Sequence, residues 1–477
     1  MKAKFSEYLN SAAPSLKKLI RMLKEKYDYV SILSTDSDGF RMMVSQRSKS
    51  VTSGTMMTER GSVVRVCRDG LYSEYAFNSF DPDRIGETYD EICRQLDAQC
   101  ELLKATGSKV YKTDVLDDEP LTLFAEMETG SLPEETDLSA LMEKLSALSD
   151  RGMTLGEHVI DCRVIAQSTH VNKMFLTANR DLRQSYVYSE GNIGAIVMKD
   201  GHNEMSFQGV SGRKGPEIFD GFEAVLKEAV DTAEELLTAE KVVPGEYEII
   251  ASPEVSGLIA HEAFGHGVEM DMFVKNRALG KEYIDHRVGS DLVTMHEGAL
   301  CAEAVASYAF DDEGTPAGDV TEIDHGILKT GICDALSAKR LGTVPTGNGK
   351  RENFEHKVYT RMTNTIFDSG TDTLEDMIAS VKYGYLLKGM QSGMEDPKHW
   401  GIQCIVERGY EIKDGKLTGK VVAPLVMTGY VPDLLGSVSM CSSDREVFGC
   451  GGCGKGHKEW VKVSDGGPYL KAKARLG

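Results

Sequence analysis

The segment from residue 252 to residue 271 constrains this chain most, because it combines a marked helix start with two histidines. Ser252 suits the N-cap, where its hydroxyl can accept from a free backbone N–H, and Pro253 suits the first helical position. Apolar residues at helical spacing follow, so one face should pack against a core. His261 and His266 lie on this helix, with Glu262 beside the first. Two imidazoles can hold zinc, and an adjacent carboxylate can take a proton from a metal-activated water.

The spacing of the two histidines predicts a distortion of the helix. His261 and His266 are five positions apart, which places them about 140° apart around a regular helix of 3.6 residues per turn. A local i→i+5 turn would bring them to one face, and such turns are frequent at functional sites. Gly265 and Gly267 give the backbone the freedom for this turn. Spacing alone also allows two unrelated histidines near a helix end.

The overall composition limits the class of protein. The chain has 477 residues, enough for two or three domains, and its net charge of -20 argues against broad binding to nucleic acid or anionic membranes. It contains no run of about 20 apolar residues, which a membrane helix requires, and no apolar signal core follows Met1. Most of the ten cysteines are scattered singly, as is typical of reduced thiols. We therefore expect a cytoplasmic protein.

The element patterns predict an α+β protein with two domains. The break at Pro244-Gly245 separates an N-terminal α/β sheet domain, residues 1–243, from a strand-rich C-terminal domain, residues 244–477. Asp69-Gly70 and Asp200-Gly201 are typical of hairpin turns. We expect helices at 11–28, 83–105, 138–148 and 216–241, short separate strands at 29–33, 40–44, 159–168, 173–178, 186–188 and 194–199, and a loop at 114–137.

A catalytic zinc site usually has a third protein ligand. Glu269 and Asp271 are nearby candidates in the sequence. More distant candidates are His286, His296, His325, His356, His399, His457 and the cysteines Cys441, Cys450 and Cys453.

The glycine-rich segment 448–457 carries the cysteines that we consider first. We favour a loop there that supplies one thiolate, because glycines let a backbone approach a metal closely. Cys450-x-x-Cys453 with His457 could instead form a separate structural zinc site or a redox pair. The segment 342–351 lacks the Walker A pattern of a phosphate loop, so we interpret it as a tight loop.

Several motifs, in order, resemble the TldD/PmbA metallopeptidases, the family also called modulator of DNA gyrase. The residues from His261 to Asp271 are similar to that family's HExxxH signature. The resemblance is dense from about residue 245 to 455 and looser before. Further similar stretches are Asp311–Pro316, Thr346–Arg351, Arg361–Thr365, Cys453–Gly456 and, in the first half, Arg60-Gly61, Val64–Val66 and Asp69-Gly70.

The resemblance implies a set of site residues. It implies that His261, His266 and Cys453 bind Zn²⁺ and that Glu262 is the general base. Arg361 and Asn364 are plausible substrate contacts, with packing as the equal alternative. Two departures leave details open: Cys450 is an extra thiol, and His457 replaces a residue of the family pattern in a position that suits substrate contact.

The resemblance also implies a function. It implies a zinc peptidase that cleaves unfolded or flexible peptides in a closed chamber, formed by a dimer whose N-terminal domains contribute to the chamber and to dimerisation. The intact motif indicates the TldD-like catalytic subunit, and the partner could be a second copy or a PmbA-like subunit. The alternatives are a non-enzymatic, zinc-stabilised partner or modulator of another protein, and a zinc amidase that acts on small substrates. A purely structural zinc site would not need Glu262.

Overall fold

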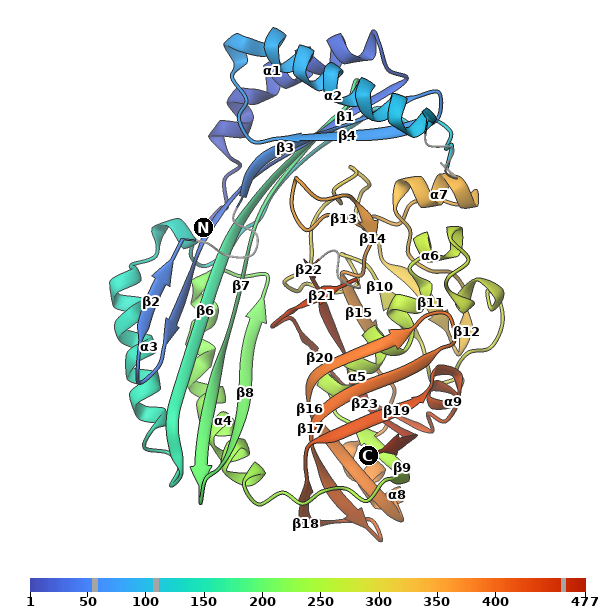
Figure 1. The fold of residues 1–477 in the computed structure, drawn as a ribbon. Helices are drawn as coiled ribbons and strands as arrows, with labels where there is room; N and C mark the ends of the chain where they lie inside the picture. Colours follow the sequence, from blue (N-terminus) through green and yellow to red (C-terminus); the bar gives the residue numbers. More distant parts are fainter. Residues whose placement is uncertain (54–58, 106–110, 456–459) are drawn as a thin grey trace.

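The computed structural model describes residues 1–53, 59–105, 111–455 and 460–477, and it confirms the predicted α+β class. The N-terminal part is one sheet in the order β4-β3-β1-β6-β7-β5, with β2 paired to β1 and β8 to β7. Its long strands rise beside the C-terminal part and curve over it (Figure 1). The strands are β1 (Tyr29–Val44), β2 (Lys49–Thr52), β3 (Glu59–Arg68), β4 (Leu71–Phe77), β5 (Leu121–Glu126), β6 (Val159–Leu176), β7 (Arg180–Lys199) and β8 (His202–Gly212).

Three of these strands are longer than the sequence pattern predicts. Each of β1, β6 and β7 replaces two predicted short strands, because the polar stretch between the two apolar runs is buried and hydrogen-bonded in the sheet. In β1, for example, Ser34 is 1% exposed and its hydroxyl lies 2.7 Å from that of Ser62. The predicted loop at 114–137 is also wrong in part, since β5 within it pairs in parallel with β7.

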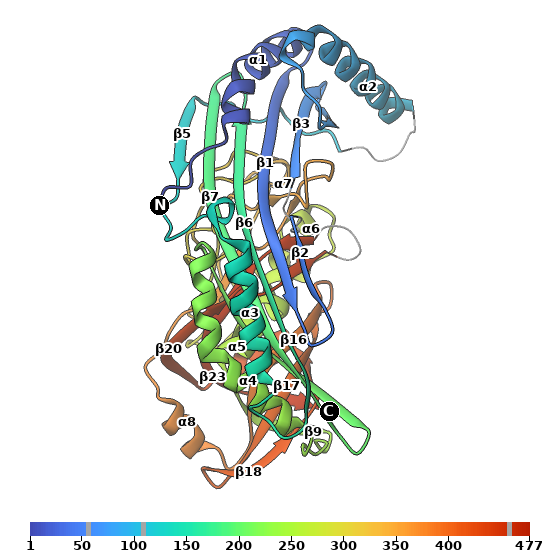
Figure 2. The same cartoon turned by 90° about the vertical axis from the view of Figure 1, so that its left-hand side faces the viewer.

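Helices cover the outer side of this sheet. The predicted helices are confirmed with shifted ends: α1 (Glu7–Lys24), α2 (Ile85–Ala105), α3 (Leu138–Gly152) and α4 (Phe222–Leu236). The helices α1 and α2 lie across the upper end of the sheet, and α3 and α4 lie side by side on its outer face (Figure 2). Both predicted hairpins are present, and Asp69, Gly70, Asp200 and Gly201 all have the positive φ angles that such turns require.

The C-terminal part contains an 11-stranded sheet that closes on itself. Strands β9, β16, β17, β19 and β23 form a ring, because β23 pairs with both β19 and β9. The strands of this part are β9 (Gly245–Ala251), β10 (Met295–Glu297), β11 (Val320–Asp324), β12 (Ile327–Leu328), β13 (Gly349–Lys350), β14 (Tyr359–Thr360), β15 (Asn364–Phe367), β16 (Tyr383–Asp396), β17 (Gly401–Lys413), β18 (Lys416–Val422), β19 (Leu425–Tyr430), β20 (Met440–Phe448), β21 (Gly452–Gly454), β22 (Trp460–Lys462) and β23 (Ser464–Leu476).

Within the described ranges, short α-helices accompany these strands: α5 (Pro253–Ile259), α6 (Asp271–Val274), α7 (Ala335–Leu341), α8 (Leu374–Ser380) and α9 (Val431–Gly436). The first of them, α5, is buried against β23 and β16. Gly257 permits this close packing, since a Cβ added there would lie 2.5 Å from the backbone nitrogen of Gly466. No helix in the described ranges is long and apolar enough to cross a membrane.

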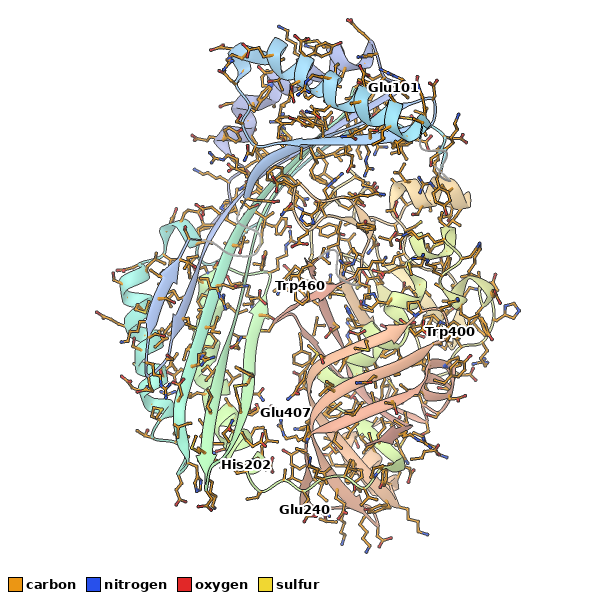
Figure 3. All side chains as sticks on the ribbon, viewed as in Figure 1. Glu101, His202, Glu240, Trp400, Glu407 and Trp460 are labelled. Carbon is orange, nitrogen blue, oxygen red and sulfur yellow. The ribbon has the colours of Figure 1, made fainter. Side chains whose placement is uncertain are left out.

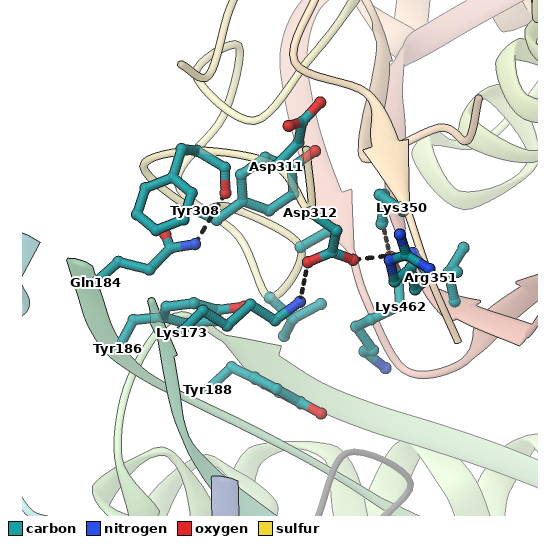
Figure 4. A pocket seen from close by; sticks show the side chains of 14 residues that line it. Lys173, Gln184, Tyr186, Tyr188, Tyr308, Asp311, Asp312, Lys350, Arg351 and Lys462 are labelled. Atoms are coloured by element: carbon teal, nitrogen blue, oxygen red, sulfur yellow. Dashed lines mark hydrogen bonds and ion pairs between the residues drawn. The ribbon is translucent and has the colours of Figure 1, made fainter. Parts of the chain in front are cut away.

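Buried ion pairs join the two parts of the molecule. Lys173 on β6 donates to the carboxylate of Asp312, whose other oxygen accepts from the backbone N–H of Arg351 at 2.8 Å (Figure 4). Arg65 on β3 lies between Glu74, at 2.6 Å, and Glu313 of the C-terminal part. Lys173 and Asp312 line a cavity of about 40 Å³, and Arg65 and Glu313 line a smaller neighbouring one. The sheet and the C-terminal part are therefore fixed to each other by charge as well as by packing.

We expect Arg65→Met to destabilise the protein by about 3–5 kcal/mol, because it leaves the buried Glu313 without its cationic partner. The matched control is Arg60→Met on the same strand, since Arg60 is 57% exposed and its pair with Asp36 contributes about 1 kcal/mol or less. Urea unfolding monitored by circular dichroism measures both. Equal shifts of the two midpoints would contradict a role for the buried pair.

Candidate metal centre

The helix that carries the two histidines is distorted as the spacing predicts. Regular α5 ends at Ile259, and residues Ala260–Gly265 form a π-helical segment. The segment lies against Met362, and a Cβ added to Gly265 would be 2.1 Å from the sulfur of that residue. Ser252 occupies the predicted N-cap position, but its hydroxyl donates to the carboxylate of Glu254 rather than accepting from a backbone N–H.

The π-helical segment brings both histidines to one face, where they meet a cysteine from the far end of the chain. The rings of His261 and His266 lie 5.2 Å apart and nearly perpendicular. The Sγ of Cys453 on β21 lies 3.3 Å from Nε2 of His266. One ligand atom from each of the three residues falls within 4.8 Å of the other two. Among the described residues, this trio is the one group of three or more such side chains that could hold a metal ion.

The electrostatics of the trio favour a thiolate. Burial would raise the pKa of the Cys453 thiol, but His261 and His266 outweigh burial and lower this pKa to about 4. Burial likewise opposes protonation of His261, yet Cys453 raises the pKa of this histidine to about 9. Burial also opposes protonation of His266, yet Cys453 and Glu269 raise the pKa of this histidine well above its usual value, so the site favours positive charge next to the sulfur. A divalent cation would satisfy the same requirement.

A carboxylate lies behind each of the two imidazoles. Nδ1 of His266 lies 3.1 Å from the buried Glu269, which also receives Lys455 at 3.0 Å. Nδ1 of His261 faces the carboxylate of Asp465 on β23 at 3.9 Å. In both cases Nδ1 is directed toward an acid, which leaves Nε2 to face the centre of the trio. This is the usual arrangement behind metal-binding histidines.

The other candidate ligands lie elsewhere in the structure. Glu269 sits behind His266 rather than beside it in the trio, and Asp271 pairs with Lys455 at 2.7 Å. His296 binds the surface acids Asp319 and Asp368. The group that could hold a metal comprises His261, His266 and Cys453. It includes none of the other candidate ligands among the described residues. His457 lies outside the described residues.

The two thiols of the glycine-rich segment point to different places. Cys453 faces the histidines, whereas Cys450 donates to the backbone carbonyls of Val210 and Gly191, in the N-terminal sheet, at 3.3 and 3.5 Å. This geometry therefore disfavours the alternative in which Cys450 and Cys453 bind the same metal ion.

The two proposed substrate contacts are fully buried. Arg361 donates from Nη2 to the backbone carbonyl of Cys453 at 2.8 Å. Asn364 donates to the carbonyl of Gly298 at 3.0 Å and to the hydroxyl of Ser307 at 3.1 Å. Neither side chain lines the cleft at the metal centre. Their contact with substrate stays a prediction, while their packing roles are visible.

A cleft of about 820 Å³ opens onto the trio. Glu262, 8% exposed, lies in its wall beside the histidines, and a Cβ added to Gly393 of β16 would be only 2.4 Å from Cγ of Glu262. Trp460, labelled in Figure 3, lies at the same cleft between the long N-terminal strands and the C-terminal sheet. The cleft therefore presents three candidate metal ligands, the carboxyl group of Glu262 and the backbone of β16 to a ligand.

Sequence reasoning missed the outer partners of this site. Asp465 and Lys455 flank the described ligands, but neither lies at a spacing that marks it as a partner of a particular histidine. Glu190 of β7 also reaches the loop that carries Cys453, by accepting from the backbone N–H of Gly451 at 3.0 Å. The sequence pattern places Glu190 near a strand, but this position does not indicate a contact with a residue 261 positions away.

Known proteins share both the sequence and the fold of this chain. Residues 244–474 match the family model described as the PmbA/TldA metallopeptidase C-terminal domain. A metalloprotease of Methanocaldococcus jannaschii is 32% identical over 284 residues, 60% of this chain and 62% of that protein. A metalloprotease of Synechocystis is 25% identical over 96% of both chains. A metalloprotease TldD homolog of Haemophilus influenzae is 33% identical over 58% of this chain and 59% of its own.

The aligned stretch thus spans less than two thirds of the Methanocaldococcus and Haemophilus proteins. Two solved structures share the fold over nearly the whole chain. The structure of TldE from Thermococcus kodakarensis has a TM-score of 0.76 at 18% identity and covers 97% of this chain and 100% of its own. A proposed modulator of DNA gyrase from Thermotoga maritima has a TM-score of 0.76 at 17% identity, with 98% and 100% covered. Residues 244–474, the C-terminal part of this chain, belong to the TldD/PmbA metallopeptidase family, and relatives named metalloproteases and TldD homologs share this part.

Proposed function

We propose that this chain is a zinc-dependent peptidase that hydrolyses unfolded or flexible peptides. The observation that carries the proposal is the convergence of His261, His266 and Cys453 in one cleft with the carboxylate of Glu262. Two imidazoles and a thiolate are a donor set that suits zinc, and three protein ligands leave a position open for chemistry. One relative, from Saccharolobus solfataricus, is named a zinc metalloprotease TldD homolog, which agrees with this choice of metal.

The surroundings of the trio fit a bound divalent ion. Both Nδ1 atoms face carboxylates, so both Nε2 atoms can act as ligands. Lys455 balances the charge of Glu269 behind His266, which keeps this carboxylate in its outer position. Burial would raise the pKa of Glu269, but Lys455 and His266 lower it well below its usual range.

The chain's own residues divide the work of hydrolysis. Zinc supplies a Lewis acid that makes water nucleophilic near neutral pH and polarises a carbonyl group. Glu262 takes the proton from the attacking water and passes it to the leaving amine. Glu269 holds His266 in position through Nδ1, and Asp465 lies behind Nδ1 of His261.

The peptide would bind along an open strand edge. Strand β16 pairs with β17 along its length, but with β9 only through Gly384–Leu387. From Lys388 to Asp396 its second edge has no strand partner within the described parts of the chain, and its residues Met390–Glu395 line the cleft beside Glu262. An extended peptide could pair there through its backbone, which gives weak sequence preference. A dimer, with a second copy or a PmbA-like subunit, would enclose this cleft and exclude folded proteins.

Removal and return of the metal tests the proposal. We expect a chelator to abolish hydrolysis of a casein-like unfolded chain and stoichiometric Zn²⁺ to restore it, because the described trio supplies the ligands. Dipeptide amides are assayed in parallel to separate a peptidase from an amidase of small substrates. Hydrolysis that continues in the zinc-free protein would contradict the proposal. Bound zinc with no hydrolysis of either substrate would instead favour the non-enzymatic alternative.

A further inference from the structure

The thiolate of the metal centre lies on a segment with little secondary structure of its own. Strand β21, which carries Cys453, pairs over only three residues with β22. Gly451, directly before β21, has a φ of +146°, a conformation that only glycine adopts readily. By contrast, His261 lies on the buried π-helical segment that continues α5, and His266 begins the 3-10 turn that follows it directly. The position of the sulfur must therefore be set by contacts from outside this loop.

One such contact comes from Glu190 in the N-terminal sheet. Its carboxylate accepts from the backbone N–H of Gly451 at 3.0 Å and pairs with the ammonium group of Lys462 on β22. The same ammonium group donates to the carbonyl of Gly451, and Gln167 donates to the other oxygen of Glu190. Glu190 and Lys462 are each 6% exposed. A buried ion pair thus ties β22, and the backbone directly before β21, to β7.

The second thiol of the segment provides another attachment to the same sheet. Cys450 lies over Gly209, where an added Cβ would be 2.7 Å from its sulfur. Its Sγ donates to the carbonyls of Val210 and Gly191, which lie on the neighbouring strands β8 and β7. The segment is therefore held by the N-terminal sheet on one side, while Cys453 reaches the histidines on the other.

We propose that Glu190 is a positioning residue for the metal thiolate, so that the N-terminal sheet controls how tightly the C-terminal site binds its metal. Lys462 couples the two, because it contacts both Glu190 and the carbonyl of Gly451, two residues before Cys453, and it lies at the seam between the two parts (Figure 4). The inference rests on the metal site of the proposed function, but it does not depend on peptide hydrolysis.

Glu190→Gln tests this role. The substitution keeps the shape but removes the charge that pairs with Lys462, so the segment loses its buried anchor. We expect zinc affinity to fall about 10–100-fold, the usual loss for an outer partner of a metal site. Competition with a zinc-chelating dye on the purified full chain measures it. The matched control is Glu204→Gln on the neighbouring strand β8, where Glu204 pairs with the exposed His202, and its affinity should equal that of the parent.

A second readout follows the sulfur directly. With cobalt in place of zinc, the thiolate-to-cobalt charge-transfer band should weaken in Glu190→Gln and persist in Glu204→Gln, which a general loss of stability would not produce. If the Gln variant does not fold, Glu190→Asp carries the test, with a smaller loss of affinity expected because the charge remains. Parental zinc affinity and an unchanged cobalt band in a folded Glu190 variant would overturn the inference. A parent that binds zinc without hydrolysing peptides would overturn only the proposed function.

Discussion

Glu262→Gln should lower the rate of peptide hydrolysis by about 10²–10⁴-fold and leave zinc binding unchanged, since the general base is lost and the ligands are kept. Glu262 lines the cleft next to His261, but it does not belong to the trio of metal-binding side chains. The amide is isosteric with the carboxylate, so the close contact with Gly393 of β16 is preserved. Initial rates on a casein-like chain and elemental analysis of the same sample measure the two quantities.

A control for this experiment exists on the same helix. Glu254→Gln changes a carboxylate in the first turn of α5, where it bonds the hydroxyl of Ser252 and does not line the cleft. This variant should keep both its zinc and its activity. If Glu262→Gln hydrolysed peptides as fast as the parent, Glu262 would not be the base. If it lost zinc as well, its effect on the rate could not be assigned to proton transfer.

The sequence was sufficient for the local part of this site and insufficient for the distant part. The π-helical segment followed from two histidines at a spacing that a regular helix cannot bring together, with glycines beside them. Spacing alone did not identify the third donor, which is 187 positions from His266. Its assignment required the resemblance to a family. The pairing of Glu190 with Lys462, 272 positions apart, had no local signal at all.

The same distinction between local and distant interactions explains the errors in the predicted fold. Strand β1 was predicted as two strands because its middle is polar, and a solvent-facing loop is the ordinary interpretation of such a stretch. In the molecule this middle pairs with β3 on one side and β6 on the other, and polar side chains bond across the strands, as Ser34 does with Ser62 of β3. Hydrophobic periodicity reports burial against an apolar surface. It does not detect strands that are buried against polar groups.

Cys453→Ser should abolish stoichiometric zinc binding, whereas Cys450→Ser should retain about one zinc per chain. His261 and His266 hold the pKa of the Cys453 thiol far below its usual value, so the parent offers a thiolate at neutral pH, while a serine hydroxyl stays protonated and is a poor ligand. At Cys450 the hydroxyl of serine can still donate to the carbonyls of Val210 and Gly191, and the segment keeps its attachment.

Elemental analysis of the two variants beside the parent, purified without chelators, separates the two thiols. The pair is well matched, because the same atom is exchanged three positions apart in one loop. Loss of zinc from Cys450→Ser but not from Cys453→Ser would identify Cys450 as the third ligand and contradict the trio. Loss from both would mean that attachment to the N-terminal sheet governs metal binding as strongly as the ligand itself. In that case the Glu190 variants should also lose zinc, as Cys453→Ser does. The contacts of Glu190 in the N-terminal sheet and the ligand Cys453 would then belong to one metal centre, to which both halves of the chain contribute.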